Sequence, residues 1–60
     1  MLLIVLLNDG VPYEDGRKEI RVQGIDRTEV VGDELIGYRN GEQKAKFKTA
    51  DVRNHHLEED

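Results

Sequence analysis

The chain has 60 residues, a net charge of -4 and 37% charged residues, and it contains no cysteine. A domain of this length buries only about 60% of the surface that its unfolded chain exposes, so its stability is expected to be marginal. Without cysteine, neither disulfides nor a cysteine-ligated zinc ion can stabilise the fold. Tight packing or self-association must therefore stabilise it. We expect a single domain over residues 1–60, and the lack of cysteine favours the cytoplasm.

The opening stretch MLLIVLL predicts a strand over residues 2–7. Its apolar run is much shorter than the about 20 residues of a membrane span, and no basic segment precedes it as in a signal peptide. We therefore expect no membrane association. A short aliphatic run that ends at a turn signal is typical of a strand that is buried on both faces.

Residues 8–17 contain two Asp-Gly pairs and the only proline, and they predict a long loop. The next segment, EIRVQGI, alternates apolar and polar residues as a half-buried strand does. A bulge is expected at Gly24 and Ile25, after which TEVV continues the strand.

The turn after TEVV contains Gly32 and Asp33 and leads to the strand LIGYR. A three-residue loop would place Thr28 and Val30 on the core face, and we prefer it. A two-residue loop would place Glu29 opposite Ile36 instead.

The pair Asn40-Gly41 predicts a two-residue type I′ turn between two strands. In a regular register, Ile36 faces Ala45 and Glu34 faces Phe47. The core face would then carry Ile36, Tyr38, Ala45 and Phe47, and the lysines that alternate with Ala45 and Phe47 would point to water.

The last segment, KTADVRNHHLEED, predicts one short helical turn within residues 49–53. A short strand or a frayed acidic tail at residues 57–60 would follow. A helix over residues 50–59 is the alternative, although its apolar stripe is weak.

Together these elements predict an all-β protein with about five short antiparallel strands. Such a content is typical of a small SH3-like barrel or a strongly twisted sheet. The sequence contains no motif that is specific to one family.

The aliphatic N-terminal strand is the main functional signal. If Leu2, Ile4 and Leu6 enter the core, the alternate side chains must contact something else, and burying three of them contributes about 4 to 9 kcal/mol. That is comparable with the whole stability expected of the domain. We therefore expect a domain that acts by protein–protein contact and self-associates through this strand, with an interface of Leu3, Val5, Leu7, Val31 and Leu35.

A basic strand supports an alternative hypothesis, the binding of nucleic acid. Its cations are Arg39, Lys44, Lys46 and Lys48. Exposed aromatic side chains normally accompany such a strip, whereas here the register puts Tyr38 and Phe47 on the core face. Lysines on an edge strand also prevent aggregation, which is the simpler explanation. A third hypothesis is an acidic inhibitor that imitates nucleic acid.

Metal binding and catalysis are not expected. His55 and His56 are adjacent, so their side chains would point to opposite faces of a strand and could not bind one metal ion together. The chain has no serine or cysteine nucleophile. Asp9, Glu14 and Asp15 in the long loop resemble turn formers more than a catalytic pair. We expect neither an enzyme nor a cofactor.

Overall fold

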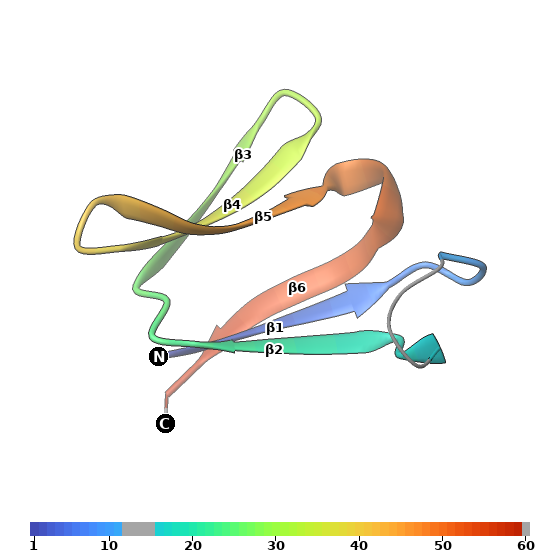
Figure 1. Cartoon of the computed structure of the whole chain (residues 1–60), viewed down its shortest axis with the longest axis horizontal. Coiled ribbons are helices and arrows are strands. Elements are labelled where there is room, and N and C mark those ends of the chain that lie inside the picture. Colours follow the sequence, from blue (N-terminus) through green and yellow to red (C-terminus); the bar gives the residue numbers. More distant parts are fainter. Residues whose placement is uncertain (12–15, 60) are drawn as a thin grey trace.

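The computed structural model describes residues 1–11 and 16–59, and it is all-β (Figure 1). Two three-stranded antiparallel sheets are formed, with the strand orders β2-β1-β6 and β3-β4-β5. The strands are β1 (Leu2–Leu7), β2 (Glu19–Gln23), β3 (Arg27–Val31), β4 (Glu34–Arg39), β5 (Glu42–Lys48) and β6 (Val52–Glu58). A 3₁₀ turn, η2 (Thr49–Asp51), precedes β6, so the predicted short helical turn is confirmed.

The segment expected to form one strand from residue 19 to residue 31 is divided into β2 and β3. The amides of Gly24 and Ile25 both donate to the Met1 carbonyl oxygen, at 2.9 and 3.1 Å. Two residues opposite one define a bulge, so the predicted bulge is confirmed. It carries the chain from one sheet to the other and leaves Ile25 fully buried between them.

The core contains the side chains of β1 that were expected to face outward. Leu3, Val5 and Leu7 are buried and pack with Ile25 and Leu35 in one cluster. Their expected outward orientation is wrong. Alternation alone does not say which face of a strand is covered, and the second sheet lies over the odd-numbered side chains.

The outer faces of both central strands carry an isoleucine that is nevertheless covered. Ile4 in β1 is 4% exposed and lies in register between Arg21 and His56. Ile36 in β4 is 8% exposed and lies between Glu29 and Lys46. Long charged side chains can cover apolar surface with their stems. The β1 strand is therefore largely covered by its own chain, and it supplies no argument for self-association.

The β4–β5 hairpin has the predicted turn and a different register. Asn40 and Gly41 have φ values of 51° and 80°, as a type I′ turn requires. A register shift beside Gly37 and Tyr38 then places Leu35, not Ile36, on the core face with Phe47. The expected core positions of Ile36 and Tyr38 and the expected interface position of Leu35 are therefore wrong.

The β3–β4 turn has two residues, because Val31 pairs with Glu34. Gly32 in its first position has a φ of 60°, which is typical of a type II′ turn. The preferred three-residue loop is wrong. Val30 still lies on the core side. It pairs with Leu35, and Leu35 is the residue of β4 that faces the core in place of the expected Ile36.

The C-terminal segment is a strand and not a helix. Leu57 packs against the core and β6 extends to Glu58, so residues 57 and 58 of the expected tail belong to a strand. Asp60 and residues 12–15 of the predicted long loop lie outside the described residues. Within the described part of the chain, no helix has the length and apolarity needed to cross a bilayer.

The orientation of β1 predicts unequal effects of two similar substitutions. Leu3→Ala is expected to lower the free energy of unfolding by about 2 to 5 kcal/mol, because a fully buried leucine leaves a cavity. Leu2→Ala is expected to cost about 1 kcal/mol or less, because Leu2 is only partly buried on the outer face. Urea unfolding measures both values. Equal losses, or a larger loss for Leu2→Ala, would contradict the described orientation.

Candidate functional site

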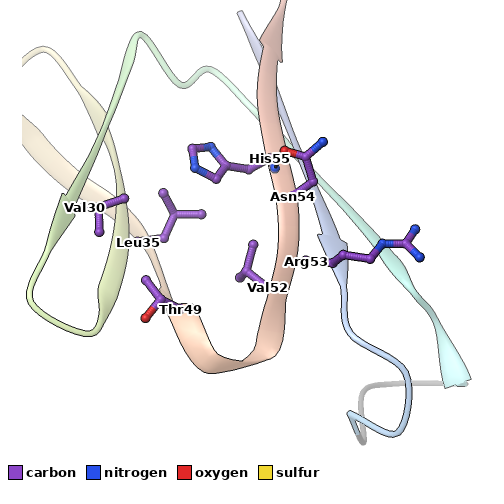
Figure 2. A pocket seen from close by; sticks show the side chains of 7 residues that line it. All are labelled: Val30, Leu35, Thr49, Val52, Arg53, Asn54 and His55. Atoms are coloured by element: carbon purple, nitrogen blue, oxygen red, sulfur yellow. Dashed lines mark hydrogen bonds between the residues drawn. The ribbon is translucent and has the colours of Figure 1, made fainter.

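A cavity of about 300 Å³ opens between the two sheets. We call it the β3–β6 cleft. Seven residues line it, and Figure 2 shows them: Val30, Leu35, Thr49, Val52, Arg53, Asn54 and His55.

The cleft lies between elements of different sheets. Val30 and Leu35 come from the β3–β4 hairpin, and the side chains of Val52 and His55 project toward them from β6 (Figure 2). The Arg53 side chain points away from this space (Figure 2). The cleft therefore has mainly apolar walls, with an imidazole ring on one side.

The turn η2 closes one end of the cleft and is held by hydrogen bonds to both sheets. The Thr49 amide donates to the Asp33 carbonyl oxygen at 2.8 Å. The Asn8 side-chain amide donates to the Ala50 carbonyl oxygen at 2.9 Å. These bonds connect η2 to the β3–β4 turn and to the end of β1, so they fix the relative position of the cleft walls.

Val30 is 57% exposed although it lies on the core side of β3. Its neighbour Val31 is 48% exposed on the opposite face. Large aliphatic side chains on both faces of one strand end are therefore open to solvent. We call these two valines at the end of β3 the exposed patch; a partner that covers this strand end would bury both.

The backbone of β3 is also free on one side, because β3 is an edge strand. Val31 and Glu34 flank the two-residue turn, so they form the hydrogen-bonded pair. By alternation, the amide and carbonyl groups of Thr28 and Val30 point away from β4. No described residue pairs with them there. A further strand could be added at this edge.

The expected interface residues do not form a common surface. Leu3, Val5, Leu7 and Leu35 are in the core, whereas Val31 remains exposed. Val31 and Leu35 also lie on opposite faces of the β3–β4 pair, because Val31 pairs with Glu34 and Leu35 pairs with Val30. Of the expected interface, only Val31 belongs to the exposed patch.

The basic strand has the predicted exposed lysines, but two of them have partners. Lys44 Nζ lies 3.3 Å from Glu42 Oε2, and Lys46 Nζ lies 3.1 Å from Glu34 Oε2. Lys48 and Arg39 are exposed and have no ion pair within the described part of the chain. Tyr38 was expected on the core face, but it lies on the outer face in register with Arg27, whose guanidinium is 4.4 Å from the centre of the ring.

The adjacent histidines lie on opposite faces of β6, as expected. His55 pairs with the buried Val5 and faces the cleft, whereas His56 pairs with Ile4 on the outer face. His56 Nε2 lies 3.1 Å from Glu58 Oε1. Over residues 1–11 and 16–59, no three potential metal ligands gather in one place. The alternation with Leu57 could have placed His55 on the core side from sequence.

The carboxylates of the long loop are only partly described. Glu14 and Asp15 lie outside the described residues. Asp9 is exposed, and its carboxylate accepts a hydrogen bond from Lys18 Nζ at 2.8 Å. This bond, together with the charges of Lys18 and Arg53, lowers the pKa of Asp9. A general acid needs a raised pKa, which is the opposite direction.

Comparison with known proteins gives no match. No protein-family model, curated protein or solved structure matches the chain. The features of the structure that bear on function are therefore the cleft and the free edge of β3.

The Asp9–Lys18 pair predicts a defined pH effect. Lys18→Ala is expected to raise the pKa of Asp9 toward its ordinary value, because the main cause of the lowered pKa is removed. The stability that the pair contributes is present above the pKa of the unfolded chain and is lost as the pH falls through the lower folded-state pKa. An NMR titration of the Asp9 carboxyl measures the shift. An unchanged midpoint in the variant would show that Lys18 is not the cause.

Proposed function

We propose that this protein is a non-enzymatic interaction domain with an SH3-like barrel arrangement of its two sheets. It binds an extended segment of a partner protein, which is added as a strand to the free edge of β3. One side chain of the segment enters the β3–β6 cleft. The observation that carries this proposal is the 57% exposure of Val30, on the core side of an edge strand and in the wall of a cavity of about 300 Å³.

Strand addition would use both the unpaired backbone edge of β3 and the cleft beside it. The backbone groups of Thr28 and Val30 would supply hydrogen bonds, which give affinity without regard to sequence. The cleft would supply selectivity through one side chain. Covering an exposed valine completely contributes about 1.5 to 3 kcal/mol, so Val30 and Val31 are the expected anchors.

The barrel arrangement is proposed from the connections between the sheets. The bulge at Gly24 and Ile25 joins β2 to β3, and η2 joins β5 to β6. Two sheets that the chain joins at these two places stay open between edge strands that it does not join, such as β3 and β6. The β3–β6 cleft is such an opening.

A partner protein is proposed in place of a second copy because β1 no longer favours self-association. Only Leu2 and Leu6 remain partly exposed on its outer face. A stable dimer needs about 800 Å² from each partner, which half-buried leucines do not provide. The exposed aliphatic side chains that favour contact with a partner are those of Val30 and Val31 in β3.

Peptide binding tests the proposal. Ten-residue random peptides displayed on phage are selected against the immobilised domain at pH 8, and the affinity of labelled binders is measured by fluorescence polarisation. Val30→Lys is expected to weaken binding by about tenfold or more, because an ammonium group in an apolar cleft loses its hydration. Amide shifts of Thr28 and Val30 are expected to change in NMR spectra on binding.

Gln23→Lys is the matched control, because Gln23 is exposed on β2 in the other sheet and the charge change is the same. It is expected to leave the affinity unchanged. A selection without any Val30-dependent peptide would refute strand addition at β3. Sedimentation of the free domain should show a monomer, and a dimer that Val30→Lys dissociates would identify a second copy as the occupant.

Nucleic-acid binding is the second candidate, and one observation favours it. Tyr38 pairs with Arg27 on the outer face of the sheet that carries the lysines, so an aromatic ring does accompany the basic strand. It ranks below protein contact because ion pairs already occupy Arg27, Lys44 and Lys46. A phosphate would have to replace a carboxylate at each of them.

The basic strand gives a prediction that separates this candidate from the first. A labelled single-stranded DNA or RNA of 20 nucleotides is expected to bind weakly or not at all at 50 mM salt. If it binds, neutralising Lys44, Lys46 and Lys48 together should abolish binding, and the affinity should fall steeply with salt. Tight, lysine-dependent binding would move nucleic acid to first place.

The acidic-inhibitor hypothesis ranks third. An imitation of nucleic acid needs carboxylates whose charge is not compensated. Carboxylates on four strands and in the long loop are instead paired with cations of the same chain: Asp9 with Lys18, Glu19 with Arg21, Glu29 with Arg27, Glu34 with Lys46 and Glu42 with Lys44.

A further inference from the structure

The His55 ring forms one wall of the β3–β6 cleft. Figure 2 shows it pointing from β6 across the cleft toward Val30 and Leu35. The residue is half-buried, and its backbone amide donates to the Asn54 side-chain oxygen at 2.9 Å. Within the described part of the chain, the ring itself has no hydrogen bond or ion pair.

The elements packed around the ring present no described charged side chain to it. On β6 itself, the Arg53 side chain points away, and His56 lies on the outer face beside Glu58 (Figure 2). The other elements contribute uncharged side chains, namely Val5 from β1, Val30 from β3, Leu35 from β4 and Thr49 from η2. A positive charge on His55 would therefore find no carboxylate in the cleft.

We propose that His55 makes the cleft selective for an uncharged aliphatic or aromatic side chain of the partner segment, and that protonation of His55 releases this segment. The inference rests on the proposed strand addition at β3. In the free domain the half-buried ring is still hydrated. The entering side chain displaces that water.

The two protonation states respond differently to this loss of water. A neutral imidazole packs against an apolar side chain at little cost. A covered imidazolium loses hydration and gains no opposite charge, which is unfavourable. Binding is thus linked to the release of a proton, and acidification weakens it. Histidine is the residue type that changes charge between about pH 5 and 8.

His56 is a matched control within the same chain. It is adjacent to His55 in sequence and lies on the opposite face of β6, where its ring is beside the Glu58 carboxylate. The His56 ring therefore lies outside the cleft. An effect of pH that belongs to histidines in general, or to the net charge, would depend on both residues.

The test uses the tightest Val30-dependent peptide from the selection at pH 8. Its affinity is measured at pH 8.0 and pH 5.5 for the unmodified domain, His55→Phe and His56→Gln. The unmodified domain and His56→Gln are expected to bind about tenfold more weakly at pH 5.5 than at pH 8.0, because the bound segment disfavours a charged His55 ring. His55→Phe, whose ring stays apolar and uncharged, is expected to bind equally at both pH values.

The possible failures are distinguishable. Equal affinity of the unmodified domain at both pH values overturns the role of His55 and leaves strand addition intact. Equal weakening in all three proteins, as acid unfolding would cause, or a pH effect that disappears only in His56→Gln, also overturns it. A selection that yields no Val30-dependent peptide overturns the proposed function and this inference together.

Discussion

The packing of β1 against the second sheet is the interaction on which the rest of the structure depends. Leu3, Val5 and Leu7 fill the space between the sheets together with Ile25 and Leu35. The chain has no cysteine, and in the part that the structure describes no cluster of metal ligands, so this apolar contact has to hold the domain together. Because β1 pairs with β2 on one side and β6 on the other, it also fixes where β6 lies opposite β3.

A core this small cannot close every opening between two three-stranded sheets. At the opening between β3 and β6, Val30 lies on the core side and is still exposed, and no strand among the described residues pairs with the backbone of β3 on that side. An apolar cavity beside a free strand edge is suited to an extended segment, because the edge binds the backbone and the cavity accepts a side chain. The same constraint that limits the core therefore creates the proposed binding site.

The charged residues of this chain mainly cover the fold. Ile4 and Ile36, at the centres of the two outer faces, are buried between charged or polar neighbours from the adjacent strands. Ion pairs such as that of Lys46 with Glu34 bring opposite charges together on the same sheet. Surface pairs of this kind contribute little to stability, about 0 to 1 kcal/mol each. They do keep the surface mixed in sign, which favours a partner recognised by apolar contact and backbone pairing over one recognised by charge.

The sequence by itself determined the all-β class and several local features: the Asn40-Gly41 turn, the bulge at Gly24 and Ile25, and the short helical turn within residues 49–53. These features depend on local backbone preferences and on alternation, which neighbouring residues reveal. Only the tertiary structure decided which face of each strand is buried, because a shift of one residue in register exchanges the two faces and the sequence pattern of an aliphatic strand such as β1 fits either choice. The placement of Val30 and His55 in one cleft followed from that decision, since β3 and β6 are distant in sequence and meet only when the two sheets pack against each other.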